Sequence, residues 1–243
     1  MKRVLIASLL AGICSISVLA QSESRSDILK QIETKRAELA KLEDQFLAPS
    51  AEDRAASSEL LSQPDAGLIR LLPREIFDDK VGKKSAMTIR GGGAYYSFGR
   101  LTHEYGYGSA IELANGNLLS GFAGADYALM TTIAEVPLET ISVDHPSLKF
   151  LTSYKVPTEE SEARREARAF GGRGNTIDGL LYISRVPVQL NTTYLLRSIN
   201  YGDSDVLVAF RILSKETDGS ITLLWKLLRK YPKPELVRSQ ATN

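Results

Sequence analysis

The strongest pattern in the chain is an alternation of apolar and polar side chains near the C-terminus. Over residues 221–228 one face of an extended chain is wholly apolar, and residues 206–212 repeat this alternation. A period of two is typical of β-strands, in which successive side chains point to opposite faces. The segment 217–220, Thr-Asp-Gly-Ser, lies between the two runs and has the composition of a tight turn. These residues predict a β-hairpin, with Trp225 in the core.

Shorter apolar runs separated by turn residues begin near residue 84. The runs that flank Asn115 and Gly116 predict a second hairpin, because both residues tolerate the positive φ of a two-residue turn. An apolar run at 127–138 has the length of a strand. The segment 155–178 is rich in charges and glycine, and it predicts a solvated loop with one or two helical turns through Glu159 to Ala169.

These runs show no alternation of strands with helices, which a parallel sheet would require. The pattern therefore favours a mainly β fold, α+β overall. We expect an antiparallel sandwich or a partly closed barrel over residues 84–235, followed by a frayed tail at 236–243.

The residues before this domain follow a helical pattern instead. Residues 24–47 lack glycine and proline, and their apolar side chains recur at spacings of four and three. The stripe consists of Ile28, Ile32, Leu39, Leu42 and Phe46, with Lys35 at an intervening position. It predicts either an amphipathic helix packed on its own chain or a short coiled coil through which copies of the chain associate. We expect residues 21–83 to form a mostly helical arm. Ser50 and Asp53 resemble a capping box and predict a second, polar helix to about Ser62, and a third short helix is expected at 65–77.

The first 20 residues resemble a targeting segment rather than a part of the fold. Lys2 and Arg3 precede an apolar run that ends at Ala20, a residue suited to a signal peptidase site. The run is short for a membrane span, so a cleaved signal peptide is favoured over an uncleaved anchor. Removal of residues 1–20 takes away Cys14, the single cysteine, and leaves a body that cannot form disulfides. We expect a secreted or periplasmic protein with no integral membrane span after removal of the signal.

Charge and composition argue against several kinds of partner. The whole chain has 30 Lys and Arg against 29 Asp and Glu, and without the two cations of the signal 28 remain against 29. Nucleic-acid binding needs a concentrated positive surface, so we expect none. Two histidines and no remaining cysteine give little basis for a metal site, and no motif indicates a cofactor.

Motifs for catalysis are equally weak. His103-Glu104 begins like a zinc-protease helix, but Tyr107 stands where the second histidine would be needed. No Gly-x-Ser-x-Gly turn is present. Glu104 could form an acid pair with Glu112 or Asp126, as glycoside hydrolysis would require.

The glycine- and tyrosine-rich stretch at 90–108 is the preferred candidate for a contact surface. Its glycines would leave room for a flat group, such as a sugar ring or a partner's peptide, to lie against the aromatic rings. The candidate contact residues are Tyr95, Tyr96, Phe98, His103, Glu104, Tyr105 and Tyr107. The alternative is architectural: the glycines permit bends, and the rings fill the core.

The sequence thus predicts an exported envelope protein without catalytic activity. We expect its β domain to bind a protein partner or a glycan, and residues 24–47 to mediate self-association or reach a partner. The alternative is a periplasmic hydrolase of envelope carbohydrate that uses Glu104 or His103 as its proton donor.

Overall fold

A computed structural model describes residues 24–77, 90–103, 105, 108–122 and 124–237. The chain divides into two compact units, residues 1–42 and 43–243. The predicted signal at 1–20 lies outside the described residues. Among the residues that are described, no helix combines the length and apolarity that a membrane span requires.

The predicted N-terminal helix is confirmed as α1 (Arg25–Phe46). Its start is capped by Ser24, whose side-chain oxygen accepts a hydrogen bond from the Asp27 amide at 3.2 Å. No residue of α1 is buried. The apolar stripe of this helix is therefore exposed, and self-association through it stays a prediction.

Two short helices follow α1 in the second unit: α2 (Ala51–Ala56) and α3 (Ser58–Leu61). Ser50 caps α2 by accepting from the Asp53 amide at 3.0 Å, as the sequence around it indicated.

The predicted helix at 65–77 is wrong in its first half. Residues Ala66–Leu71 form strand β1, and only Arg74–Phe77, after Pro73, form a short helix, α4. A short apolar run fits either a strand or a buried helix, and pairing with a distant strand, β11, decides the outcome here. The helical arm therefore contributes a strand to the β domain.

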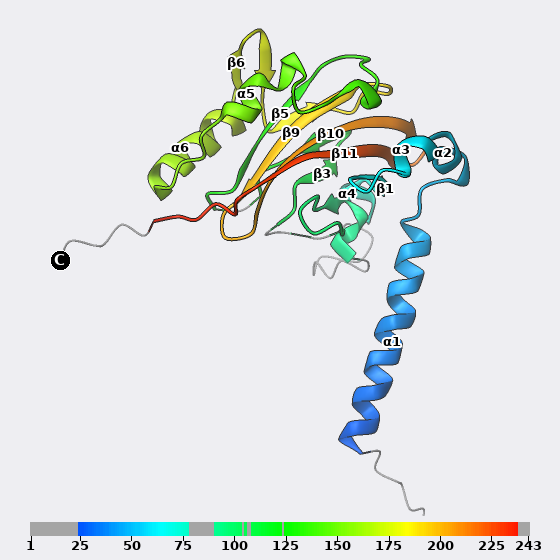
Figure 1. The fold of residues 1–243 in the computed structure, drawn as a ribbon. Helices are drawn as coiled ribbons and strands as arrows, with labels where there is room; N and C mark the ends of the chain where they lie inside the picture. Colours follow the sequence, from blue (N-terminus) through cyan, green and yellow to red (C-terminus); the bar gives the residue numbers. More distant parts are fainter. Residues whose placement is uncertain (1–23, 78–89, 104, 106–107, 123, 238–243) are drawn as a thin grey trace, which may run out of the picture. The chain divides into compact units, whose positions relative to one another are not determined.

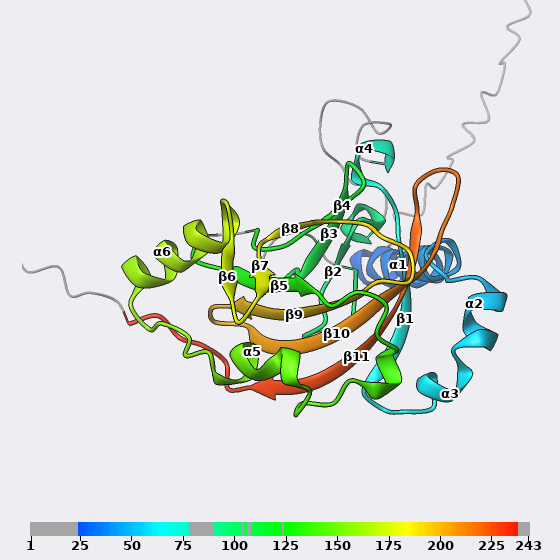
Figure 2. The ribbon, with the colours of Figure 1, turned by 90° about the horizontal axis from the view of Figure 1, so that it is seen from above.

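The main sheet contains five antiparallel strands in the order β1-β11-β10-β9-β5 (Figure 2). Its other members are β5 (Tyr127–Thr132), β9 (Thr193–Asn200), β10 (Ser204–Lys215) and β11 (Ile221–Tyr231). The predicted hairpin of β10 and β11 is confirmed, and Asp218 stabilises its turn by accepting from the Ser220 amide at 2.8 Å.

A second antiparallel sheet has the strand order β2-β3-β4-β8. Its strands are β2 (Tyr95–Tyr96), β3 (Ile111–Ala114), β4 (Asn117–Leu119) and β8 (Arg185–Pro187). The predicted hairpin turn between β3 and β4 is confirmed, since Asn115 and Gly116 have φ of 50° and 69°. A small hairpin of β6 (Asn175–Ile177) and β7 (Leu180–Tyr182) completes the strands that we describe.

The two larger sheets enclose the first of two apolar cores. Tyr96, Ile111 and Leu118 of the second sheet lie in one buried cluster with Val208, Phe210 and Trp225 of the main sheet. The mainly β, antiparallel fold is therefore confirmed, with a sandwich-like layout and no closed barrel among the described strands.

The second core lies on the opposite face of the main sheet. Leu207 and Leu224 pack there with residues from short helical elements. These elements are α3, η3 (Leu138–Thr140), η4 (Pro146–Leu148), α5 (Lys149–Ser153) and α6 (Glu160–Gly171). Figure 1 shows α5 and α6 on one side of the main sheet and β3 on the other. One further short helical element, η2 (Arg90–Gly93), directly precedes β2 in the chain.

The segment 155–178 is not mainly a loop. Helix α6 occupies twelve of its residues, and Ala163 and Phe170 are buried on one face while the charges lie on the others. The amphipathic spacing thus gives the helix a surface to pack. The tail prediction at 236–243 also needs correction at its first residues, because the Val237 amide donates to the Thr158 carbonyl at 2.8 Å. The rest of that tail lies outside the described residues.

One glycine in β1 is required by the packing of the first core. Gly67 pairs with Trp225 across the β1–β11 ladder. A Cβ atom at Gly67 would lie 2.5 Å from the Trp225 ring, which is closer than atoms can approach. The absence of a side chain at Gly67 therefore makes room for the indole.

We predict that Gly67→Ala destabilises the protein by about 1–3 kcal/mol, because the tryptophan must move within a packed core. Urea unfolding monitored by Trp225 fluorescence would measure the change. Gly171→Ala is the matched control, since its Cβ would meet no atom closer than 3.9 Å. Equal stability of the two variants would contradict the steric argument.

Candidate functional site

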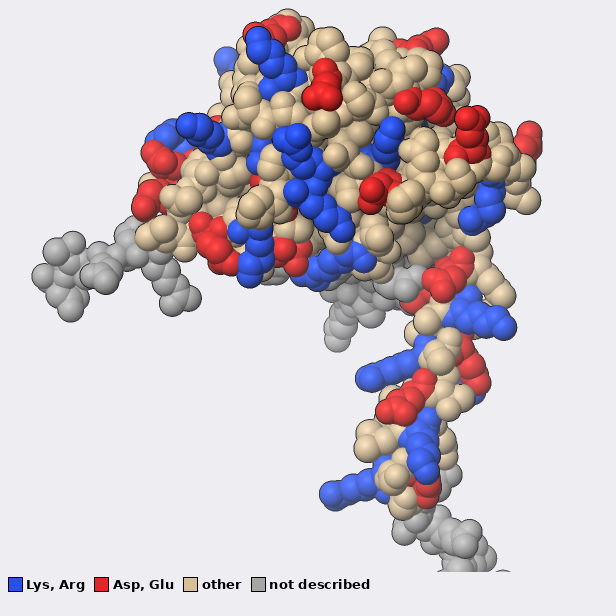
Figure 3. All heavy atoms as spheres, in the orientation of Figure 1, with Lys and Arg blue, Asp and Glu red and all other residues tan. Residues whose placement is uncertain are grey.

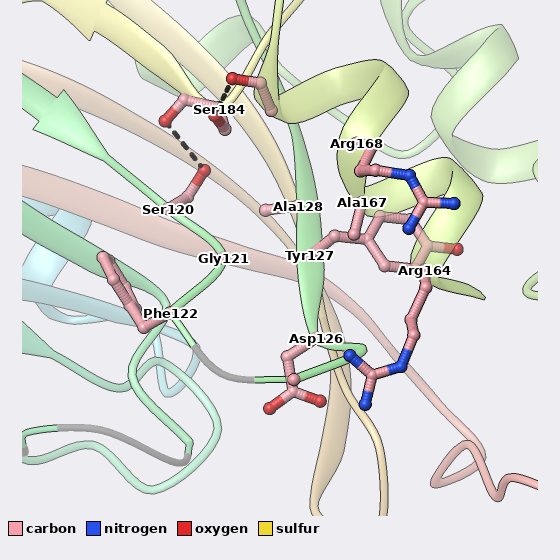
Figure 4. Close-up of a pocket in the computed structure, with 12 residues that line it drawn as sticks. Ser120, Gly121, Phe122, Asp126, Tyr127, Ala128, Arg164, Ala167, Arg168 and Ser184 are labelled. Atoms are coloured by element: carbon pink, nitrogen blue, oxygen red, sulfur yellow. Dashed lines mark hydrogen bonds between the residues drawn. The ribbon is translucent and has the colours of Figure 1, made fainter. Parts of the chain in front are cut away.

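A pocket of about 320 Å³ lies at the edge of the main sheet (Figure 4). Its walls come from the loop at 120–124, the start of β5 and the face of α6. Phe122 stands on one side, and Arg164 and Arg168 on the other. The volume is at the lower end of the range of about 300–1,000 Å³ that is usual for small-molecule sites.

Asp126 supplies the carboxylate of the pocket. It directly precedes β5, is only 8% exposed, and accepts a hydrogen bond from the Tyr201 amide at 2.8 Å. Burial raises the pKa of this carboxyl group to about 6. The nearby charge of Asp203 raises the pKa further, whereas the hydrogen bond from Tyr201 acts in the opposite direction.

Helix α6 contributes two guanidinium groups one helical turn apart, which places them on the same face. Arg164 pairs with Glu160 at 2.7 Å. In Figure 4 its guanidinium turns toward the carboxylate of Asp126, but no salt bridge joins Asp126 to either arginine. The guanidinium of Arg168 makes no hydrogen bond or ion pair with any residue in the described part of the chain. Asp126 and Arg168 therefore bring opposite charges to one pocket without satisfying each other.

The wall behind these groups is fixed by a buried network of tyrosines. The Tyr127 hydroxyl lies 2.8 Å from that of Tyr154, which donates to Glu166 at 2.9 Å. Burial raises the pKa of both Tyr127 and Tyr154, so both rings stay neutral. Since Glu166 belongs to α6, this network holds the helix against β5.

The end of α6 is anchored through Ser184, which lines the opposite part of the pocket. The Ser184 amide donates to the Phe170 carbonyl at 2.9 Å, and its own carbonyl accepts from the Ser120 amide at 2.9 Å. One residue thus connects α6 to the loop at 120–124. Backbone hydrogen bonds therefore join two walls of the pocket.

Most of the contact residues predicted at 90–108 lie inside the protein. Tyr95, Tyr96, Phe98 and His103 are at most 8% exposed, which favours the architectural alternative for these four. Phe98 packs edge-on against Trp225 at 5.6 Å between ring centres. Tyr105 is 60% exposed, whereas Glu104 and Tyr107 lie outside the described residues.

His103 has a structural contact as well. One of its ring nitrogens, Nε2, lies 2.9 Å from the Arg70 carbonyl of β1, and its ring packs against Tyr96 at 5.3 Å. A proton donor for catalysis needs access to a substrate. The buried position of His103 does not provide such access.

Glu112 and Asp126, the two proposed partners of Glu104 in an acid pair, have different surroundings. Glu112 is buried, and its Oε1 accepts from Arg74 and from the Tyr95 hydroxyl, each at 2.9 Å. Its charge is thereby balanced within the fold. Asp126 alone of the two lies in the pocket.

The 90–108 stretch nevertheless borders the pocket through its aromatic rings. The Tyr95 ring contacts Phe122 at 5.6 Å and Tyr105 at 5.0 Å. Phe122 in turn lines the pocket. The aromatic residues of this stretch therefore lie next to the pocket, but none of those described lines it.

Sequence reasoning missed Arg164 and Arg168 because they lie in the segment expected to be a loop. Their spacing of four, together with apolar residues at 163, 167 and 170, is the signal that could have placed them on one helix.

On the face of residues 43–237 that Figure 3 shows, Lys and Arg alternate with Asp and Glu. Within the described part of the chain, no group of three or more His, Cys, Asp or Glu side chains could hold a metal ion.

The fold and the pocket together define an antiparallel β protein with two larger sheets, a layer of short helices on one face of the main sheet, and a charged pocket at the edge of that sheet. No protein-family model, curated protein or solved structure matches the chain.

Because the pKa of Asp126 is raised in the native state, we predict that the stability of the protein depends on the ionisation of this group. Between about pH 4 and pH 6 the carboxyl group of Asp126 keeps its proton in the native state but loses it in the unfolded state. The free energy of unfolding therefore falls as the pH rises through this range, and the full loss is reached above pH 6. Asp126→Asn should therefore be more stable than the wild type at pH 7.5 by about 1–2 kcal/mol, with a smaller difference at pH 4.5.

Urea unfolding at the two pH values measures this difference. Asp144→Asn, at an exposed position, is the control and should show no such dependence on pH. The same response in both variants would show that Asp126 ionises like an exposed carboxyl group.

Proposed function

We propose that the chain is an exported, non-catalytic protein of the cell envelope that binds a glycan in the pocket between β5 and α6. The observation that carries the proposal is a pocket in which Asp126 and Arg168 have no ionic partner among the described residues. Groups that the fold leaves in this state are available to a ligand.

The chemistry of the lining suits a saccharide. Asp126 can accept hydrogen bonds from sugar hydroxyls, and the two arginines can donate to ring and hydroxyl oxygens. Phe122 is partly exposed at the wall and offers an apolar face for a sugar ring. A few directed polar groups around an aromatic wall are typical of small-molecule sites.

The absence of catalysis is supported by the number of carboxyl groups. Glycoside hydrolysis generally uses two, placed on either side of the bond that breaks. Asp126 is the one carboxyl group among the described residues that line the pocket. The alternative, a carbohydrate hydrolase, is favoured by one observation: a carboxyl group with a pKa of about 6 suits a general acid.

Export is supported by the leader-like residues 1–20 and by the lack of any cysteine after them. A pocket that faces the medium outside the cytoplasm would have access to envelope carbohydrate.

We predict that soluble fragments of bacterial cell-wall sacculi bind the purified mature chain, and that Asp126→Ala together with Arg164→Ala weakens this binding at least tenfold. Loss of the acceptor and of one donor removes hydrogen bonds that a sugar would otherwise make. Isothermal titration calorimetry measures the affinity. Arg165→Ala is the control, because Arg165 belongs to α6 but does not line the pocket.

Chromatography of the same fragments after incubation tests the hydrolase. New reducing ends that disappear in Asp126→Asn would establish hydrolysis and overturn the non-catalytic proposal. Fragments that bind neither the wild type nor the variants would overturn the glycan site.

We also propose that α1 pairs with the same helix of a second copy. The stripe residues are between 41 and 62% exposed, and their alternating spacing of four and three is typical of a coiled-coil seam. Lys35 within the seam weakens such a pair, which is consistent with a short and reversible contact.

Sedimentation velocity of the mature chain should show a concentration-dependent species larger than one copy. Leu39→Glu should shift it to a single copy, because a charge in the seam would be buried without a partner. Ala37→Glu adds the same charge on the opposite face of the helix and should leave the association unchanged. A wild-type chain that sediments as one copy at every concentration contradicts the proposal.

A further inference from the structure

We infer that the pocket between β5 and α6 selects saccharides that carry a carboxylate, and that Arg168 forms the ion pair with it. This inference rests on the proposed glycan-binding function and specifies its ligand.

The first reason is the state of the two arginines. The charge of Arg164 is already balanced by Glu160 at 2.7 Å, so this side chain is best suited to donate to neutral oxygens. Arg168 lies one helical turn further along and has no acceptor in the described part of the chain. Its guanidinium can form two parallel hydrogen bonds to a carboxylate, which neither a hydroxyl nor a ring oxygen can match.

The second reason is the position of the carboxylate that the protein itself supplies. Asp126 lines the same pocket but forms no salt bridge with Arg168. Its backbone bond to Tyr201 holds it at the start of β5, while Arg168 stands on the helix across the pocket. The acceptor for sugar hydroxyls, Asp126, and the partner for a carboxylate, Arg168, are therefore separate groups. An acidic sugar carries both hydroxyls and a carboxylate and can use both.

The third reason is the aromatic wall. Phe122 is held by its edge contact with Tyr95 at 5.6 Å. A sugar ring that lies against Phe122 can direct its hydroxyls toward Asp126 and its carboxylate toward α6. A neutral saccharide can accept single hydrogen bonds from Arg168 but has no carboxylate to accept the two parallel ones.

Asp126 also makes the selectivity depend on pH. The charged groups near it are Asp203 and Arg164, and the backbone amide of Tyr201 donates to it. Protonation of Asp126 removes one negative charge from the pocket, so an anionic ligand should bind more tightly at pH 5 than at pH 7.5. A neutral ligand has no charge to be repelled by Asp126 and should not show this gain.

The test uses D-glucuronate and D-glucose as probes, with binding to the mature chain followed by NMR chemical-shift titration. We expect glucuronate to bind at least tenfold more tightly than glucose, and Arg168→Gln to remove this difference. Arg165→Gln, the control on the same helix, should keep it. Binding of glucuronate should strengthen about threefold or more from pH 7.5 to pH 5.

The outcomes separate this inference from the proposed function. If sacculus fragments bind but glucuronate has no advantage over glucose, or if Arg168→Gln leaves that advantage intact, the inference is wrong and the glycan site stands. If neither the fragments nor the sugars bind, the proposed function fails, and the inference fails with it.

Discussion

Burial of β10 and β11 on both faces is the constraint on which the rest of the structure depends. Val208 and Phe210 face one core, and Leu207 and Ala209, on the same strand, face the other. A strand that is apolar on both faces cannot belong to a sheet that has one face in water. The hairpin therefore requires a layer on each side, and the remaining segments supply the two layers.

The same constraint explains the polar groups inside the second core. Arg197 of β9 and Asp205 of β10 are nearly inaccessible to water, at 4% and 3% exposure of their side chains. The guanidinium forms two hydrogen bonds to Asp205, and it also donates to the Leu151 and Tyr154 carbonyls at 2.8 Å each. A buried charge is tolerated when its hydrogen-bonding groups are satisfied in this way. Arg197 thereby connects the sheet to the end of α5, so the helical layer is bound by specific contacts as well as by apolar packing.

The sequence allowed the hairpins to be predicted because their signals are local. Asn115-Gly116 and the turn at 217–220 each specify a connection between neighbouring strands. Strand β1 could not be predicted in this way, since its partner β11 lies about 150 residues away and the run at 66–71 has no local preference strong enough to decide. The sequence indicated Asp126 as a candidate carboxyl group, but its grouping with α6 was missed for a similar reason. Arg164 and Asp126 meet only through the packing of α6 on β5, whereas the aromatic residues at 90–108 attracted notice through composition and are mostly used in the core.

The location of the pocket follows from the layers. Strand β5 is at the edge of the main sheet. The loop at 120–124 arrives from the second sheet and α6 from the helical layer, so the pocket has one wall from each. Inside the cores every charge needs a partner within the protein, as Arg197 shows. At this edge the exposed Arg168 is solvated by water. Asp126 is 8% exposed and is held by the Tyr201 amide, and its burial appears as a raised pKa. At this edge the sandwich keeps two charged groups available for a ligand, although ionised Asp126 lowers the stability of the fold.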